Sequence, residues 1–546
     1  MSAGLTTPPA IVRQFRQIVL WPVQLMPIKA GAPVQCHWEA LEKVKDGNPW
    51  QRWRGKFNIG ETEDFRERHY KEFVTFLPFV QRFLYGSPAG QEKSEDSGVS
   101  SIRVYRRSDV ASARLTFADG WVRECAIHRC DLYFFHDADV LILVLEVSSS
   151  ELPLDRAQDL LFRFARAYPA FWETDGAPGN CMRKVEWLDE RGATLAVSDC
   201  EDKERYVEHV ARYRTPCLAS HWAWLIQPLG LEIPGQTAAL KFRQLEYYRM
   251  PFMAYLALDD PHCLTRADFV RLAYVTKPGP SEELEYSEEW LKNFETNYCD
   301  DRYWGRSGER SKGETRLVCT GRTIALVGEN NNSFFSGFET GLLAQFRHQY
   351  FLLFLISHFN KAALLSMSDE LAVAMNRLSV GDTESVKEFK RTIRQSMEVF
   401  LRFTHRYWFH AVSNQDQARM LFRRMREHLH LDELYEEVRT EGMDMSNYLD
   451  TDSGRRQANT VLRLTVVTIF GLIGTIATGF LGMNLLALAD KTPIYRIGLF
   501  LLVSATTVVV TGVMIVKSKR LADFLDALSN DRIGWRRKWQ EWKKVW

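Results

Sequence analysis

Threonine and glycine residues recur along one face of an apolar segment near the C-terminal end of the chain. On a helical wheel this face carries Thr465, Thr468, Leu472, Thr475, Gly479 and Gly482, with Asn484 at its outer end. Such a face has two interpretations. Small and hydroxyl side chains let membrane helices pack closely. Alternatively, several copies of the helix surround an axis, so that the hydroxyls line a narrow wet path and the glycines widen its mouth.

The other faces of the same segment have different characters. Gly471, Gly474 and Thr478 form a small-residue face that is typical of close helix packing. A wholly apolar face, suited to lipid or to a second span, carries Val466, Phe470, Ile473, Ala477 and Phe480. Without Asn484, helix packing alone would be the better explanation of this segment. Lipid disfavours an amide side chain, so the presence of Asn484 favours the interpretation as a pore.

Two segments are long and apolar enough to cross a bilayer. Residues 461–481 carry a single charge, Arg463, and residues 497–516 carry none. At about 1.5 Å per helical residue, each covers a hydrocarbon core of about 30 Å. Basic residues flank both segments on the sides away from the short, nearly neutral loop that joins them: Arg455, Arg456, Arg463, Lys517, Lys519 and Arg520. The positive-inside rule therefore predicts cytoplasmic N- and C-termini and an external loop.

The triplet Gly482-Met483-Asn484 stands at the outer end of the first predicted span, which has a short external loop and a basic inner flank. In this position it resembles the GMN motif of the CorA family of divalent-cation channels. The stretch LTVVTIF (464–470) is similar to the family's pore helix, and the resemblance covers roughly residues 415–520. It implies a homopentamer with the first spans around one pore, the second spans outside them and a large cytoplasmic funnel.

The resemblance also assigns roles to individual residues. It implies that Asn484 forms the outer selectivity site and that Gly482 and Met483 shape the turn. A hydroxyl ring further inward falls on Thr475, with Thr468 as another pore-lining residue and Gly479 at a small-residue position. The candidates for the family's apolar constrictions towards the cytoplasm are Leu472, Leu464 and Val461.

These assignments agree with the chemistry of a hydrated divalent ion. Mg²⁺ gives up its water reluctantly, so a neutral ring of amide oxygens can hold the ion without stripping it. A negative cell interior supplies about 2.3 kcal/mol per charge per 100 mV for cation entry. The sequence contains no GxxxxGK[ST] phosphate loop, which agrees with transport that does not use ATP. One departure concerns the external loop, where family members commonly carry an acidic segment. Here Lys491 and Arg496 offset the negative charge of Asp490, so the loop has no net negative charge that would concentrate cations. The transported ion could therefore be Zn²⁺, Co²⁺ or Ni²⁺ as well as Mg²⁺.

Composition describes a mainly water-soluble protein with a small membrane part. The chain has 546 residues, Lys+Arg 70 against Asp+Glu 69, and a mean hydropathy of −0.26. This balance argues against a nucleic-acid partner. The 9 cysteines are scattered without a CxxC pair, which indicates a reducing compartment. We therefore expect a multi-pass protein of a bacterial inner membrane whose bulk lies in the cytoplasm.

The expected class is α+β, with a mixed cytoplasmic domain, a long helical stalk and two C-terminal transmembrane helices in a CorA-like funnel. The predicted divisions are 1–335 (mixed α/β, with a polar linker near 86–100), 336–458 (helical bundle and stalk), 459–520 (two-helix transmembrane domain) and 521–546 (basic, tryptophan-rich tail). In the tail, one helix face of tryptophans could lie at the membrane interface or pack on another helix of the protein.

Local patterns predict several elements. We expect strands at 113–117, 131–135 and 140–147, the last followed by a helix over 154–168, and a hairpin of 315–319 with 323–327. Ser336 and Glu339 fit a capping box that opens a long helix, buried because its apolar stretch is too short for a span. A second helix is expected over 383–411. A third begins near Ser413 and could continue into the membrane, with slack at Gly442 and Gly454.

Three clusters could bind a metal. Strand alternation places His128 and Cys130 on one face and Cys125 on the other, which favours ordinary sheet residues over a zinc site. His428 and Asp432 have helical spacing and are expected to form a surface pair. The stalk residues Asp444, Asp450 and Asp452 could form an inhibitory cation site, or a solvated stretch ahead of two arginines.

The sequence favours a CorA-type channel that is not an enzyme and that needs no cofactor besides its transported ion. No convergent catalytic set is visible. The alternative is a ligand-controlled membrane effector or sensor, in which residues 1–335 bind a small molecule that gates the pore. The large size of this region, without a matching motif, motivates the alternative.

Overall fold

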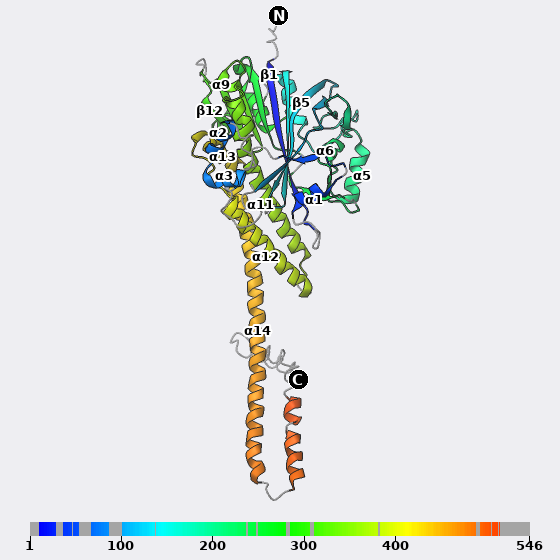
Figure 1. The fold of residues 1–546 in the computed structure, drawn as a ribbon, viewed down its shortest axis with the longest axis vertical. Coiled ribbons are helices and arrows are strands. Elements are labelled where there is room, and N and C mark those ends of the chain that lie inside the picture. Colours follow the sequence, from blue (N-terminus) through cyan, green and yellow to red (C-terminus); the bar gives the residue numbers. More distant parts are fainter. Residues whose placement is uncertain are drawn as a thin grey trace. The chain divides into compact units, whose positions relative to one another are not determined.

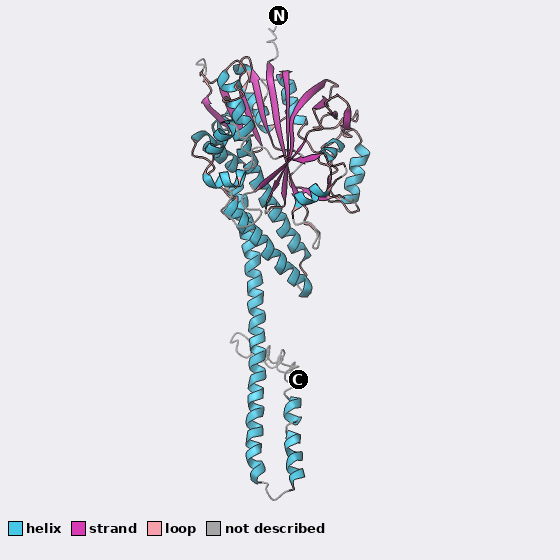
Figure 2. Cartoon of the chain, viewed as in Figure 1, coloured by secondary structure: helices cyan, strands magenta, loops and turns pink. Residues whose placement is uncertain are grey.

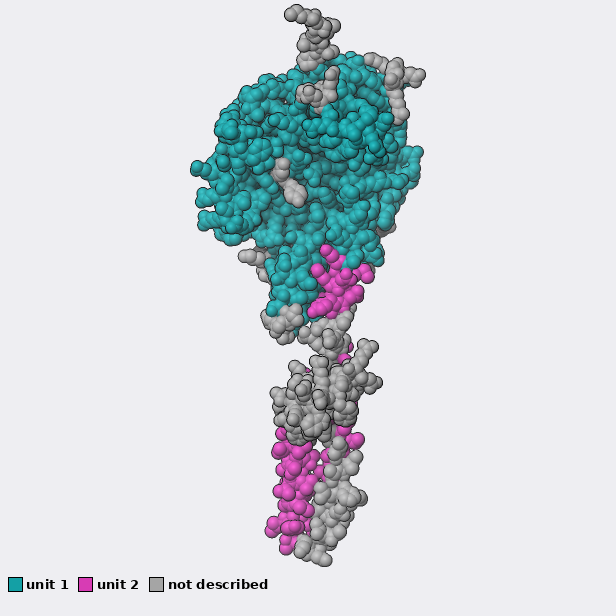
Figure 3. All heavy atoms as spheres, turned by 180° about the vertical axis from the view of Figure 1, so that it is seen from behind, with its two compact units in different colours: residues 1–440 teal, residues 441–546 magenta. Residues whose placement is uncertain are grey.

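The computed structural model describes residues 10–28, 36–45, 47–53, 67–86, 101–136, 138–235, 238–246, 249–279, 284–305, 311–379, 383–487, 492–503, 505–510 and 513. The predicted linker beyond residue 86, the external loop over 488–491 and the tryptophan-rich tail lie outside these residues. The chain divides into two units, residues 1–440 and residues 441–546, which Figure 3 colours separately. The predicted mixed α+β class is confirmed by a large sheet accompanied by many helices (Figure 1).

Unit 1 is built on a mixed 14-stranded sheet whose main path is β12-β13-β14-β11-β1-β6-β5-β4-β7-β8. The strands are β1 Ile11–Leu25, β2 Trp50–Arg52, β3 Ile102–Arg107, β4 Ser112–Thr116, β5 Val122–Phe135, β6 Val140–Pro153, β7 Lys184–Leu188, β8 Thr194–Val197, β9 Leu229–Leu231, β10 Leu240–Gln244, β11 Phe252–Leu258, β12 Cys299–Tyr303, β13 Thr315–Cys319 and β14 Thr323–Glu329. The pairs β11–β14 and β9–β10 are parallel. The predicted strands and the predicted hairpin are confirmed, since β13 and β14 pair antiparallel.

Helices lie on both sides of the central strands (Figure 2). They are α1 His37–Lys43, α2 Glu67–Thr75, α3 Pro78–Tyr85, α4 Leu154–Arg163, α5 Lys203–Tyr213, α6 Ser220–Leu225, α7 Arg266–Tyr274, α8 Glu288–Tyr298, α9 Ser333–Ser336, α10 Leu342–Gln345, η3 Phe346–Tyr350, α11 Phe351–Arg377, α12 Thr383–Arg406, α13 Asp416–His428 and α14 Leu431–Ala487. The helix α4 follows the buried strand β6 as predicted, but it ends earlier than residue 168, at Arg163. Both α4 and α11 contact β1 and β6.

The continuous apolar run of β6 reflects burial on both faces of the sheet. Leu143 belongs to the core that also contains the apolar residues of α4. Its neighbour Ile142 lies opposite Tyr133 of β5, and the Tyr133 ring packs edge-on against Phe351 of α11 at 5.9 Å between ring centroids. Successive residues of a strand point to opposite faces, so a strand covered on both sides needs apolar residues at every position.

A buried carboxylate connects the start of the long helix to the sheet. Glu146 is 1% exposed, and Arg347 donates to its Oε1 at 2.7 Å. Arg16 and Arg129 lie 3.2 Å and 3.0 Å from the same carboxylate. Burial alone would raise the pKa of Glu146, but the arginines outweigh it and hold the pKa below its ordinary value. Glu146 therefore remains charged within its arginine cluster.

The predicted capping box at Ser336 is wrong. Ser336 ends the short helix α9, which is capped by Asn332, whose side chain accepts from Phe334 N–H at 3.0 Å. The next helix begins at Leu342, after Gly341. A Cβ built on Gly341 would lie 2.6 Å from the nitrogen of Gly337, so the two glycines permit a tight turn between the helices. This close approach depends on the folded chain and not on local spacing.

The prediction that the third helix runs on towards the membrane is also wrong in detail. The helix α13 ends at His428, and His430 adopts a left-handed backbone with φ 52°. The helix α14 then begins at Leu431 and passes through both Gly442 and Gly454. An ion pair between Arg426 and Asp432 spans this joint. The predicted second helix is confirmed but ends earlier, at Arg406.

By length and composition, two helices of the described chain could cross a membrane. The first is Leu342–Arg377, whose apolar window is 83% buried in unit 1, as expected for the core helix of a soluble domain. The second is Pro493–Val510 in unit 2, whose window is 0% buried. In α14 the apolar part found among the described residues is Thr460–Ile469, although the helical backbone continues to Ala487.

Candidate functional site

The residues predicted to line a pore share an exposed face of α14. Val461, Leu464 and Leu472, the predicted apolar constrictions, are 62%, 67% and 61% exposed. Thr468, Thr475 and Gly479 are exposed as well. None of these residues is buried by the described part of the chain, so this face remains available to another molecule or to lipid.

A different face of α14 packs on the second apolar helix. A Cβ built on Gly474 would lie 2.8 Å from Cγ2 of Thr507 in the helix Pro493–Val510. Thr478, one turn further along, is half-buried. A Cβ on Gly471, which was predicted on the same face, would meet no atom within 4 Å, so this face packs only from Gly474 onward. A Cβ on Gly479 would also meet no atom within 4 Å. The small-residue face at Gly474 and Thr478 therefore serves helix packing, and the face with Thr475 and Gly479 does not.

The threonine hydroxyls of α14 bond back to their own helix. Thr468 Oγ1 donates to Leu464 O at 2.8 Å, and Thr475 Oγ1 donates to Gly471 O at 2.9 Å. A hydroxyl has one hydrogen to donate and two lone pairs that accept. Because each hydrogen is already used, these oxygens can only accept further hydrogen bonds. Such acceptors suit the outward-pointing water hydrogens of a hydrated cation better than they suit an anion.

The predicted turn at the triplet is not present in the structure. The helical backbone of α14 continues through Gly482, Met483 and Asn484 to Ala487. The side chains of Met483 and Asn484 lie outside the described part of the structure. At about 100° per residue, position 484 lies about 140° around a continuous helix from position 479. Asn484 can face the same pore axis as Gly479 and Thr475 only if the helix ends or unwinds near Gly482.

The candidate metal sites outside the predicted spans gain no support among the described residues. Asp444 is exposed on α14, and the side chains of Asp450 and Asp452 lie outside the described part. Within that part, no group of three or more His, Cys, Asp or Glu side chains could hold a metal ion. The stalk aspartates therefore remain a sequence prediction.

The predicted alternation at Cys125, His128 and Cys130 is broken by a bulge. The register of β5 against β6 shifts between Ile127 and Arg129, so one extra residue is inserted at His128. Consequently Cys125 and Cys130 lie in the same buried core, where burial raises the pKa of the Cys125 thiol to about 12. His128 Nε2 lies 2.7 Å from Ser148 Oγ, as expected for an ordinary residue of the sheet.

The predicted surface pair of His428 and Asp432 does not form, because the helix ends between them. His428 stacks on Tyr298 at 4.3 Å between ring centroids, and its Nε2 lies 3.3 Å from Asn297 O. Burial lowers the pKa of His428. Asp432 instead pairs with Arg426 across the joint. These residues connect α13 and α14 to the body of unit 1.

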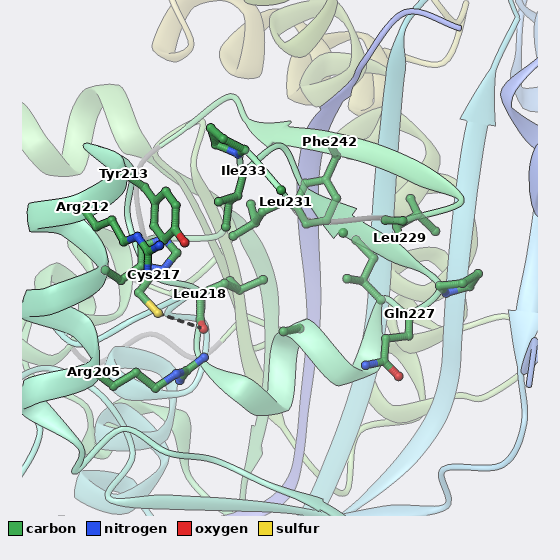
Figure 4. Close-up of a pocket in the computed structure, with 18 of the residues that line it drawn as sticks. Arg205, Arg212, Tyr213, Cys217, Leu218, Gln227, Leu229, Leu231, Ile233 and Phe242 are labelled. Carbon is green, nitrogen blue, oxygen red and sulfur yellow. Dashed lines mark hydrogen bonds between the residues drawn. The ribbon is translucent and has the colours of Figure 1, made fainter. Parts of the chain in front are cut away.

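Sequence reasoning did not find the cavities of unit 1. One has a volume of about 880 Å³ and is shown in Figure 4. Arg205, His209 and Arg212 line it from one face of α5, and apolar residues of the β9–β10 region, including Leu231 and Phe242, line its other wall. A ligand with an anionic and an apolar part would fit this lining. The helical spacing of the three basic residues is a sequence signal that could have pointed to this cavity.

A second cavity, of about 390 Å³, has several acidic side chains. Among them, Glu370 of α11 accepts from Ser396 Oγ of α12 at 3.4 Å. Burial and the neighbouring Asp139 raise the pKa of Glu370 to about 7. Glu370 is therefore protonated in the folded protein at pH values where an ordinary glutamate is charged.

We expect the contribution of Glu370 to the stability of unit 1 to fall as the pH rises from about 5 to 8. The folded state binds a proton at Glu370 up to pH about 7, whereas the unfolded chain releases it near its ordinary pKa of 4.5, so stability falls across this window. Glu370→Gln keeps the neutral form and should be more stable than the wild type at pH 8 by about 1–3 kcal/mol, but not at pH 5. Thermal unfolding at both pH values measures the difference. Glu388→Gln, in the same cavity, is the control, and equal behaviour of the two variants would contradict the assignment.

Comparison with known proteins assigns no family to the chain. No protein-family model matches it, and no curated protein matches it. The CorA resemblance accordingly depends on the triplet, on its place at the end of an apolar helix and on the helix that follows.

Proposed function

We propose that this protein is a divalent-cation channel of the CorA type in a bacterial inner membrane, with both termini in the cytoplasm. Five copies of α14 would surround the pore in a homopentameric funnel, and the transported ion would be Mg²⁺, with Zn²⁺, Co²⁺ and Ni²⁺ as alternatives. The observation that carries the proposal is the exposed face with Thr468, Thr475 and Gly479, which the pairing of α14 with the second apolar helix leaves uncovered.

Symmetric assembly gives that face a physical role. Rings of threonine oxygens whose hydrogens are already bonded would accept hydrogen bonds from the water around a cation. The exposed leucines and valine nearer the cytoplasm would form apolar rings, which can close a pore by excluding water. No carboxylate inside the bilayer is required, and the membrane potential drives a divalent ion inward with about 4.6 kcal/mol per 100 mV.

A ligand-controlled effector or sensor is the second candidate. The cavities of unit 1 favour it, since a structure that only supports a pore needs no lined cavity of about 880 Å³. In this version the same pore would respond to a small molecule and dissipate ion gradients.

The proposal is tested by ion flux into proteoliposomes that contain the purified full-length protein. Mg²⁺ and Zn²⁺ entry would be recorded with trapped fluorescent indicators while a K⁺ gradient imposes inside-negative potentials. We expect uptake of a divalent ion that increases with the potential. A folded oligomer that passes no divalent ion at any potential would refute the channel.

Gly482→Ala is expected to reduce divalent flux at least about fivefold. Alanine stabilises a helix by about 1 kcal/mol relative to glycine and would hold position 484 away from the pore axis. A Cβ on Gly482 meets no atom within 4 Å, so a clash within the chain would not explain the loss. Gly498→Ala, in the second helix, is the matched control, because a Cβ on Gly498 also meets no atom within 4 Å. Equal flux in both variants would show that the helix need not unwind at Gly482.

A further inference from the structure

A third cavity of unit 1, of about 350 Å³, lies at the joint between α13 and α14. Its walls come from segments far apart in the sequence: α4, the start of β11, the end of α7, the β13–β14 hairpin, α11 and the joint itself. The lining residues used below are Arg166, Arg249, Tyr274, Thr320, Arg322, Thr323, Lys361, His428, Leu429 and His430. We name this the joint cavity.

The joint cavity is strongly cationic. Arg166, Arg249, Arg322 and Lys361 line it, and its described lining includes no carboxylate. Glu246 pairs with Lys361 from nearby. Burial alone would raise the pKa of Glu246, but Lys361 and its cationic neighbours hold it below the ordinary value. Arg249 and Arg322 have no ion-pair partner in the part of the chain that the structure describes, so the cavity carries an excess of positive charge.

The groups around this charge match phosphate chemistry. Arginine forks bind phosphate oxygens in a bidentate manner, and lysine adds a point charge. Arg166 is 2% exposed, and its Nε donates to Phe162 O at 2.8 Å, which fixes its orientation. Thr320 and Thr323 add hydroxyls from the hairpin, and Tyr274 adds an aromatic wall. The volume lies within the range of small-molecule sites, about 300–1,000 Å³.

The same cavity contacts the start of the proposed pore helix. His428, Leu429 and His430 line it, and α14 begins at the next residue, Leu431. The hairpin that carries Arg322 also touches this joint, because a Cβ on Gly321 would lie 3.0 Å from the carbonyl carbon of His428. A ligand held between the hairpin and the joint would therefore alter the packing at the beginning of α14.

We propose that the joint cavity binds an anion with two or more linked phosphate groups and that binding changes ion flux through the pore. The first part concerns unit 1 alone, whereas the second rests on the proposed channel function. Tripolyphosphate and ATP distinguish a free polyphosphate from a nucleotide, since they share the phosphate chain and differ in the nucleoside.

Binding is tested by isothermal titration of the detergent-solubilised full-length protein with each probe, without divalent cations. We expect at least one probe to bind, and Arg249→Gln and Arg322→Gln each to weaken its dissociation constant at least tenfold. Arg191→Gln, which removes the same charge from an exposed turn between β7 and β8, is the control and should change it less than twofold. Unchanged melting temperatures without probe would show that the variants fold. Binding of neither probe, or equal weakening by the control, would overturn the site.

Coupling is tested by divalent flux into proteoliposomes at a clamped free Mg²⁺ concentration, with and without the bound probe on both sides. In the wild type, the bound probe should raise or lower the flux at least threefold. In Arg322→Gln, the fluxes with and without probe should be closer to equal. Equal fluxes in the wild type despite binding would overturn the coupling. The absence of flux under every condition would instead refute the channel, while the titration would still decide the site.

Discussion

Replacing Asn484 by alanine is expected to abolish selective divalent-cation flux. The resemblance places one amide from each subunit at the outer end of the pore, where amide oxygens would hold the water shell of the ion. Each lost hydrogen bond is worth about 1 kcal/mol, and a symmetric ring loses one per subunit. We expect divalent flux, or its preference over Na⁺, to fall at least tenfold in the proteoliposome assay.

Asn447→Ala is the control for this variant, because Asn447 lies on the same helix α14 but outside the predicted span. The comparison requires that both variants elute as the same oligomer as the wild type. If Asn484→Ala conducts with unchanged rate and selectivity, the triplet has no role in conduction. The exposed threonine and glycine face would then need another explanation, such as packing between copies.

Gly474→Leu is expected to separate the two apolar helices of unit 2. Even the Cβ of alanine would lie 2.8 Å from Thr507 Cγ2, closer than real Cβ contacts, and leucine adds three more carbons. Overpacking of this kind typically costs about 1–3 kcal/mol in each chain. We expect a lower melting temperature in detergent and a loss of the assembled oligomer, measured by size-exclusion chromatography with light scattering.

Gly498→Leu provides the matched control, since a Cβ built on Gly498 would meet no described atom within 4 Å, whereas one on Gly474 would clash with Thr507. It should retain the melting temperature of the wild type. A Gly474→Leu protein as stable and as oligomeric as this control would show that α14 and the second helix do not pack at Gly474. It would also remove the argument that helix pairing leaves the threonine face uncovered.

Much of the mixed domain could be predicted from local patterns. The run from Val140 to Val147 is apolar at almost every position, which predicts a buried strand before any partner is known. The structure confirms it as part of β6, covered by α4 on one face and α11 on the other. The hairpin of β13 and β14 was equally visible, because Gly321 supplies the positive φ of its turn.

Two of the predictions that failed depended on uninterrupted periodicity. A bulge at His128 brings Cys125 and Cys130 to one face, although strict alternation separates them. The joint at His430 breaks a helix whose sequence contains no proline or glycine at that point. In both cases contacts with other parts of the chain outweigh local preference, which amounts to less than about 1 kcal/mol per residue.

The sequence by itself determined the apolar helices, the distinct faces of α14 and the central strands, because each follows from the period of neighbouring residues. Only the tertiary structure decided that Gly474, and not Gly471 of the same small-residue face, packs against the second helix. It alone also brought Arg166, Arg249, Arg322 and Lys361 around one cavity. Periodicity shows which residues share a face, but it does not show which distant segment covers that face. That choice is made by the packing of the whole chain.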